Sequence, residues 1–213
     1  MIDVRNVSLK IKTHNILEHV TLQCKKGEIC GLIGRNGSGK TMLMKCICGF
    51  VHPTQGEIFV QGKKIGEDVD FIPDAGIMIE TPGFIPYYSG RKNLKLLSMV
   101  QNKISDNEIN EAMKRVGLDP GLKKSVKKYS LGMRQRLGLA QAIMENPEIL
   151  ILDEPFNGLD KEGVEQMREY LQELKCSGKT ILLSSHSTED IEVLCDRVYE
   201  MEHGKLAMCE KNM

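Results

Sequence analysis

The chain has 213 residues, which is long enough for one large domain, two small ones, or one domain that carries an insertion. Lysine plus arginine and aspartate plus glutamate both number 29, so the net charge is zero and gives no general attraction to nucleic acid. No run of residues reaches the roughly 18 to 20 apolar positions that span a bilayer, and the start of the chain lacks the apolar core of a secretion signal. We therefore expect a soluble cytoplasmic protein, with its seven cysteines reduced and mostly buried.

The first third of the chain has the pattern of antiparallel strands. Residues 2–11 (IDVRNVSLKI) alternate between apolar and polar side chains, and residues 20–24 (VTLQC) follow as a second strand. Residues 57–65 (EIFVQGKKI) alternate as well and contain a Gln-Gly turn signal. These segments predict an antiparallel sheet.

The middle and the last third of the chain differ in character. Ser105 and Glu108 stand in capping-box spacing and Gly117 is a helix stop, so residues from about 84 to 140 are predicted to be mostly helical. After that, the apolar runs EILILD (148–153) and KTILLSS (179–185) alternate with the amphipathic stretch 164–175. This order predicts parallel strands with crossover helices, followed by a terminal hairpin over 199–210 with a His-Gly turn.

A phosphate-binding loop is predicted between a strand and a helix. Its eight residues match GxxxxGK[ST] at every fixed position, and they are Gly34, Arg35, Asn36, Gly37, Ser38, Gly39, Lys40 and Thr41. Glycines let backbone N–H groups turn toward phosphate oxygens, and the following helix directs the positive end of its dipole to the same point. Lys40 would add a cation near the β- and γ-phosphates, and the Thr41 hydroxyl would ligate Mg²⁺. The alternative is a glycine-rich turn with an incidental lysine.

Two carboxylates follow the buried run 149–152. Asp153 and Glu154 stand at the end of a predicted strand, where open α/β sheets place their ligands. Adjacent carboxylates are costly there unless positive charge is bound, and Mg²⁺ with a nucleotide would supply it. We expect Asp153 to hold the metal and Glu154 to polarise the attacking water. A solvated acidic strand end is the alternative.

Two further polar residues are candidates for the same region. The turn-rich loop 156–160 could place Asp160 against a neighbouring surface. The strand over 179–185 delivers His186 to the same edge of the sheet as Glu154, although a lone histidine is more often structural or solvated.

The stretch YSLGMRQR (129–136) completes a set of five motifs. Together with the P-loop, ILILDEP (149–155), NGLD (157–160) and SSH (184–186), it resembles the nucleotide-binding domain of ATP-binding cassette (ABC) transporters over essentially the whole chain. YSLGM corresponds to that family's signature motif, which is commonly LSGGQ. Ser130 and Gly132 keep that form, and the positions that depart from it are Tyr129, Leu131 and Met133.

The resemblance implies a fold class and a domain organisation. The fold would be an α/β P-loop NTPase of the ABC type, with a mixed core sheet, an N-terminal antiparallel β subdomain and an inserted helical subdomain. Residues 1–213 would form one ATP-binding domain, in which about 1–83 and 141–213 make the nucleotide-binding core and about 84–140 the helical part with the signature motif.

The resemblance also implies how the chain works. Two copies would stack head to tail when ATP and Mg²⁺ bind, so that Ser130 and the backbone amides of the signature motif in one copy face the γ-phosphate held by the other. Gly132 and Asp160 would belong to the same nucleotide site. His186 would steady that phosphate, with Lys40 and Glu154 as the other catalytic groups. Separate transmembrane permease subunits would hold the chain peripherally on the inner face of the cell membrane, and no nucleic acid is expected.

Two positions depart from the family pattern. Glu80 stands where the family has a glutamine that reaches the metal and the water, so we expect a catalytic and metal-binding role for Glu80 with a higher Mg²⁺ requirement or altered coupling. The setting IETPG (79–83) is similar to cassettes that export bacitracin or lantibiotic-type peptides. Where the family stacks adenine on an aromatic ring, segment 11–14 offers only His14.

Two questions stay open at the level of sequence. Residues 84–88 (FIPYY) are either a local core patch or part of a docking groove for a short helix from a membrane subunit. The function itself has two alternatives to a transport ATPase: a soluble ABC-type factor that acts on nucleic acid or ribosomes, and a nucleotide-gated regulatory subunit with little turnover, which Glu80 would suggest.

Overall fold

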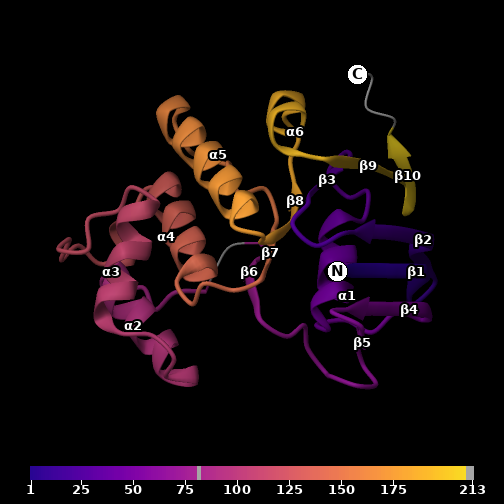
Figure 1. Ribbon diagram of the computed structural model, residues 1–213, viewed down its shortest axis with the longest axis horizontal. Coiled ribbons are helices and arrows are strands. Elements are labelled where there is room, and N and C mark those ends of the chain that lie inside the picture. Colours follow the sequence, from indigo (N-terminus) through magenta and orange to yellow (C-terminus); the bar gives the residue numbers. More distant parts are fainter. Residues whose placement is uncertain (81–82, 210–213) are drawn as a thin grey trace.

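The strands of the first third form a four-stranded antiparallel sheet in the computed structural model, which describes residues 1–80 and 83–209. Residues 81–82 of the IETPG segment and residue 210 of the predicted hairpin lie outside the described residues, as do 211–213. The strand order is β2 (His14–Cys24), β1 (Ile2–Ile11), β4 (Gln55–Val60) and β5 (Lys63–Lys64), as Figure 1 shows on its right side. The predicted Gln-Gly turn joins β4 to β5 with positive φ at both Gln61 and Gly62.

A six-stranded sheet forms the centre of the molecule. Its strands, in spatial order, are β10 (Lys205–Cys209), β9 (Arg197–Glu202), β3 (Ile29–Ile33), β8 (Thr180–Ser184), β7 (Ile149–Leu152) and β6 (Ala75–Met78). All neighbours pair in parallel except β10, which pairs antiparallel with β9 through the turn at His203 and Gly204. The predicted parallel strands and terminal hairpin are thus confirmed.

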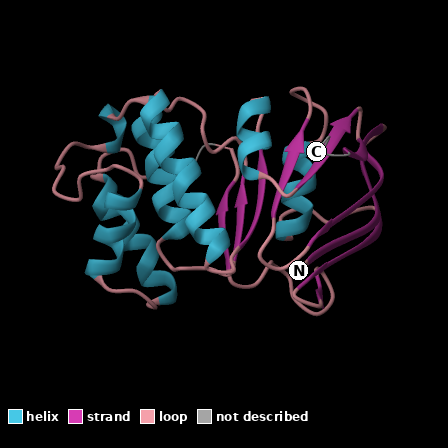
Figure 2. Cartoon of the chain, turned by 45° about the horizontal axis from the view of Figure 1, so that its top comes forward, coloured by secondary structure: helices cyan, strands magenta, loops and turns pink. Residues whose placement is uncertain are grey.

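The helices lie around and beyond this sheet. They are α1 (Lys40–Cys48), α2 (Gly90–Gln101), α3 (Asp106–Arg115), the 3₁₀ turn η1 (Val126–Lys128), α4 (Leu131–Ile143), α5 (Lys161–Cys176) and α6 (Thr188–Leu194). Figures 1 and 2 show that α2, α3 and α4 gather at one end of the molecule, with the antiparallel sheet at the opposite end. The predicted helical stretch is therefore present, although α4 continues past residue 140 to Ile143.

Alternation along the buried strands divides the core into two layers. In β7, Leu150 and Leu152 pack into the layer that also contains apolar residues of α3, α4 and α5, whereas Ile149 and Ile151 pack into the layer shared with α1 and the antiparallel sheet. Because successive side chains of a strand point to opposite faces, one continuous apolar run serves both layers. Full burial of each such side chain contributes about 1.5–3 kcal/mol.

Most cysteines agree with the expectation of buried thiols, although Cys176 is exposed and Cys209 is half-buried. Cys46 and Cys48 are buried on α1, and burial raises the pKa of both thiols to about 12, so neither is ionised at neutral pH.

None of the helices in the described part of the chain is long and apolar enough to cross a lipid bilayer.

Candidate nucleotide-binding site

The predicted phosphate loop connects β3 to α1, as the motif requires. Helix α1 begins at Lys40 after the N-cap residue Gly39, and no side chain caps it, so its first-turn N–H groups can bind an anion. Gly34 has a φ of 143° and lies against β9, because a Cβ placed there would be 2.2 Å from the Met201 carbonyl oxygen. The glycine is therefore a steric requirement of the loop.

The polar groups of this loop fit a phosphate ligand. The Lys40 ammonium is buried and donates to the Gly34 carbonyl at 2.6 Å and to the Arg35 carbonyl at 3.3 Å. The Ser38 hydroxyl is the one buried side-chain oxygen or nitrogen of the described residues that has no hydrogen-bond partner. Since buried polar atoms are nearly always paired, this hydroxyl indicates a ligand atom at the loop.

The loop lines a cavity of about 560 Å³ that His186 and Thr188 also border. Both come from the region where β8 ends and α6 begins, so the cavity lies at the carboxyl ends of the parallel strands. This is the edge at which open α/β sheets bind their ligands. The predicted residues Gly34 to Ser38 and His186 are thus brought together.

Asp153 and Thr41 meet beneath the loop, although 112 positions separate them in the chain. The Thr41 hydroxyl donates to Asp153 Oδ2 at 2.7 Å, and the Ser184 hydroxyl at the end of β8 donates to Asp153 Oδ1 at 2.6 Å. Hydrogen bonds to a charged group contribute roughly 1.5–3 kcal/mol each, which compensates for the burial of this carboxylate. A hydroxyl and a carboxylate are hard oxygen ligands, so the pair fits Mg²⁺.

Glu154 follows Asp153 directly and has an unusual backbone conformation. Its φ of 50° lies in the left-handed region, which is unusual for a residue with a side chain. Its N–H donates to the Ser184 hydroxyl at 2.8 Å, and its carboxylate lies 2.8 Å from Nδ1 of the exposed His186. Ser184, which sequence reasoning placed only at a strand end, therefore links Asp153 to Glu154.

The signature residues lie in a second hollow. Ser130, Gly132 and Asp160 border a cavity of about 660 Å³ that shares no residue with the cavity at the phosphate loop. Ser130 is the N-cap of α4 and its Oγ accepts from the Met133 N–H at 3.2 Å, which leaves the hydroxyl proton available to an outer acceptor. A Cβ on Gly132 would lie 2.5 Å from the Gly158 carbonyl oxygen, so only glycine allows this approach.

Asp160 stands at the start of α5 in this second hollow. Its Oδ1 accepts from the Arg136 guanidinium at 3.2 Å, and the same guanidinium donates to the Val116 carbonyl at 2.7 Å. The NGLD loop is therefore fixed to the signature helix within one chain. Of the predicted nucleotide residues, Gly34 to Ser38 and His186 thus border one hollow, whereas Ser130, Gly132 and Asp160 border the other.

Glu80 has a partner that sequence reasoning missed. Its carboxylate accepts from the Lys45 ammonium at 2.6 Å, and Lys45 belongs to α1, 35 positions earlier. The glutamate side chain is 61% exposed. Lys45 therefore offsets the negative charge of Glu80, the residue that the family resemblance implies beside the metal and the water, while the predicted catalytic and metal-binding roles of Glu80 stay predictions.

Replacing Lys45 by methionine is expected to raise KM for ATP at saturating Mg²⁺ by about two- to fivefold, the range that an exposed ion pair of less than about 1 kcal/mol allows. The physical reason is that an unpaired Glu80 carboxylate repels the phosphates. In a Glu80→Gln background the same replacement should have little effect, and equal effects in the two backgrounds would contradict a role through Glu80. ATP titrations of the four proteins at saturating Mg²⁺ measure this.

His14 lies at the hairpin between β1 and β2, opposite Ile11. Its ring Nδ1 is 3.4 Å from the Thr13 hydroxyl, and both residues are exposed. The same strand reaches the phosphate loop further along, because the Ile16 carbonyl oxygen lies 3.1 Å from where a Cβ on Gly39 would be. Adenine binding by His14 stays a prediction.

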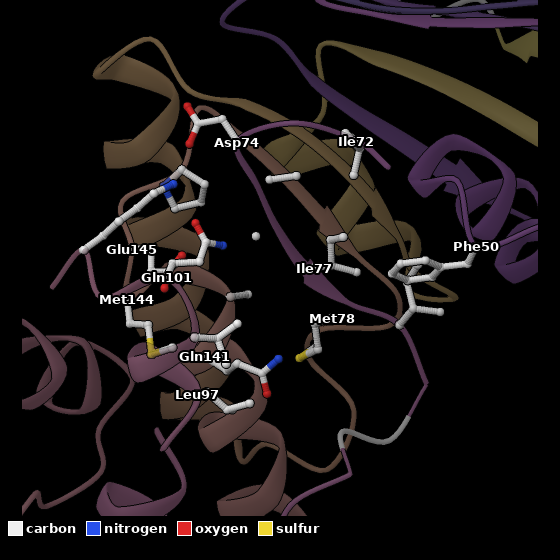
Figure 3. Close-up of a pocket in the computed structure, with 17 residues that line it drawn as sticks. Phe50, Ile72, Asp74, Ile77, Met78, Leu97, Gln101, Gln141, Met144 and Glu145 are labelled. Carbon is white, nitrogen blue, oxygen red and sulfur yellow. The ribbon is translucent and has the colours of Figure 1, made fainter. Parts of the chain in front are cut away.

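A groove of about 520 Å³ separates the core from the helical end. Figure 3 shows Phe50, Ile77 and Met78 on one side of this groove, facing Leu97, Gln141 and Met144 across it. Val100 of α2 also lines it and is 82% exposed.

The FIPYY cluster is not one unit in the structure. Phe84 packs partly buried against the core layer of α3 to α5, whereas Ile85 and Tyr87 are exposed, Tyr87 to 77%. Lys92 of α2 places its ammonium 3.7 Å from the centre of the Tyr88 ring. The interpretation as a core patch therefore holds for Phe84, whereas the docking role of this segment stays a prediction, and none of its five residues lines the groove in Figure 3.

Known proteins resemble this chain over nearly its whole length. An uncharacterized ABC transporter ATP-binding protein of Bacillus subtilis is 44% identical over 99% of this chain and 97% of its own length. A bacitracin transport ATP-binding protein of Enterococcus faecalis is 38% identical over 97% of this chain and 68% of that protein. A lantibiotic transport ATP-binding protein of Streptococcus pyogenes is 35% identical over 98% of this chain and 90% of that protein.

Solved ATP-binding cassettes share the fold of this chain. A dimeric, post-hydrolysis ATP-binding cassette bound to ADP and Pi superposes with a TM-score of 0.89 at 22% identity, and the match covers all of both chains. Residues 17–157 match the family described as ABC transporter. The predicted fold class and the predicted resemblance are confirmed, and the chain belongs to the ABC transporter family as an ATP-binding cassette of the ATPase class.

Proposed function

We propose that two copies of this chain bind and hydrolyse ATP between them and thereby drive a transporter. The observation that carries this proposal is the separation of the predicted nucleotide residues into two hollows of one chain. One hollow is lined by the phosphate loop and by His186, whose ring contacts the Glu154 carboxylate, and the other presents Ser130 at the start of a helix. In a head-to-tail pair, the phosphate-loop hollow of each copy would face the Ser130 hollow of the other copy. The dimeric cassette that shares this fold supports such an arrangement.

Within one copy, the residues divide the chemical work. Lys40 and the α1 N–H groups bind the phosphates, and Ser38 supplies a further donor. Thr41 and Asp153 would hold Mg²⁺, which neutralises phosphate charge when bound. Glu154 accepts a proton from the attacking water, and His186, hydrogen-bonded to Glu154, orients this carboxylate and faces the γ-phosphate.

The partner copy completes the site. Ser130 donates its hydroxyl proton to the γ-phosphate, and the α4 N-terminus adds its dipole to the same charge. Hydrolysis removes the bridging phosphate, so the two copies separate. A chemical step is thereby converted into movement.

The movement would be passed to separate membrane subunits through the groove in Figure 3. Its apolar lining and the exposed side chains of α2, among them Leu97 and Val100, suit the apolar face of a short helix from such a subunit. The chain would then be cytoplasmic and peripheral at the inner face of the membrane. Relatives that transport bacitracin and a lantibiotic support export of a hydrophobic or peptide-like substrate, with resistance to an antimicrobial peptide as the outcome.

The Val100→Asp variant tests the groove. With the membrane subunits co-expressed, we expect it to lose at least about 90% of its membrane-bound fraction, because a charge in an apolar contact costs several kcal/mol. The matched control is Val193→Asp on α6, because Val193 is 55% exposed and does not line the groove. The proposal fails if both variants stay on the membrane to the same extent, and thermal melting checks that each is folded.

A further inference from the structure

The backbone of Glu154 is held from both sides by side chains of other elements. Its N–H donates to the Ser184 hydroxyl, and its carbonyl oxygen accepts from Nε2 of Gln135 at 2.7 Å. The Asn157 N–H donates to the same oxygen at 3.2 Å and closes the local turn. A residue with positive φ persists only where its surroundings determine it, so these contacts set the direction of the carboxylate.

Gln135 reaches Glu154 from the signature helix. It is half-buried and lies on α4, which begins at the N-cap Ser130. Gln135 comes five positions after Ser130, which corresponds to roughly 7.5 Å along a helix. The other hydrogen bonds of Glu154 come from β8, its own loop and His186, so Gln135 is the contact that ties the carboxylate to the helical end of the molecule.

We infer that Gln135 is a positioning residue for hydrolysis: its amide holds the Glu154 carbonyl and thereby aims the carboxylate at the attacking water. This inference rests on the proposed role of Glu154. In the proposed dimer, α4 touches the partner's nucleotide through Ser130 and the backbone carbonyl of the catalytic Glu154 of its own copy through Gln135. The rate of hydrolysis at the nucleotide of one copy therefore depends on how α4 of that copy contacts the nucleotide bound by its partner.

The first test removes the donor and keeps the size of the side chain. Gln135→Leu is expected to lower kcat about 10- to 100-fold, as small misplacements of a catalytic group do, while KM for ATP and the affinity for ADP change by less than about twofold. The matched control is Gln172→Leu. The Gln172 amide on α5 also donates to a backbone carbonyl, that of Val193 on α6, at 3.1 Å. That control should keep kcat within about twofold.

The second test replaces the amide donor of Gln135 by a carboxyl group, which donates a hydrogen bond only when it is protonated. A glutamate at position 135 can donate to the carbonyl only when its carboxyl is protonated. We expect the kcat of Gln135→Glu, divided by that of the unaltered protein, to rise at least about threefold from pH 8 to pH 5.5, because facing a carbonyl oxygen favours the neutral carboxyl. A purely structural role for Gln135 would not produce this pH dependence.

The outcomes separate the inference from the function on which it rests. The inference is wrong if Gln135→Leu keeps its kcat, if its loss of kcat is matched by Gln172→Leu or by lost ADP affinity, or if the glutamate variant shows a flat ratio. If Gln135→Leu does not fold, the pH ratio of Gln135→Glu decides. Full hydrolysis by Glu154→Gln would instead remove the proposed role of Glu154 itself.

Discussion

Glu154→Gln is expected to slow ATP hydrolysis by about 10²- to 10⁴-fold, the usual contribution of a general base, and to leave ATP binding intact. Glutamine has the size of glutamate but cannot accept the proton of the attacking water. The phosphate-binding groups Lys40 and Ser38 are unchanged, so the nucleotide stays bound. The ATP-bound dimer should then accumulate.

Phosphate release and analytical ultracentrifugation with MgATP measure the two effects. Glu169→Gln is the matched control, because Glu169 is an exposed glutamate on α5 away from the acidic pair, and it should hydrolyse ATP at the unaltered rate. An active Glu154→Gln protein, or an inactive one that stays monomeric at all ATP concentrations, contradicts the proposed function.

Ser130→Asp is expected to abolish ATP-dependent dimerisation without unfolding the signature helix. Ser130 has two roles, since it caps α4 within its own chain and is proposed to contact the partner's γ-phosphate. Alanine would remove both, at a cost of about 0.5–2 kcal/mol for the cap alone. Aspartate is itself a good N-cap, so it preserves the helix and repels only the phosphate.

Ser130→Asn provides the matched comparison, because asparagine caps a helix equally well and carries no charge. Introduced into the Glu154→Gln background, aspartate should raise the dimer dissociation constant at least about 100-fold and asparagine much less, with melting temperatures of both near that of the parent. Equal dimerisation of the two variants in MgATP would show that this position does not meet the partner's nucleotide.

Local chemistry was readable from the sequence wherever a motif is contiguous. The phosphate loop, the acidic pair at the end of β7 and the capping box of α3 each depend on residues a few positions apart, so spacing alone predicts them. In the structure Ser105 donates its N–H to the Glu108 carboxylate at 2.7 Å, as the capping box requires. The strand-loop-helix context of the phosphate loop is likewise present.

The contacts between distant segments were not readable. The pairs Lys45–Glu80 and Gln135–Glu154 join residues on different elements, and no spacing rule relates them. The FIPYY cluster also needed the packing of α2 to divide it between core and surface. Such contacts depend on which faces of helix and sheet meet, and a single sequence does not specify those faces.

By itself the sequence determined the elements, their order and the chemistry carried by each motif, because backbone geometry and side-chain periodicity act over a few residues. Only the tertiary structure decided that Thr41, Asp153 and Ser184 form one hydrogen-bonded group while Ser130 and Asp160 lie in a separate hollow. The physical reason is that the parallel sheet brings the ends of β7 and β8 to one edge beside the P-loop at the start of α1, whereas α4 begins at the helical end of the molecule.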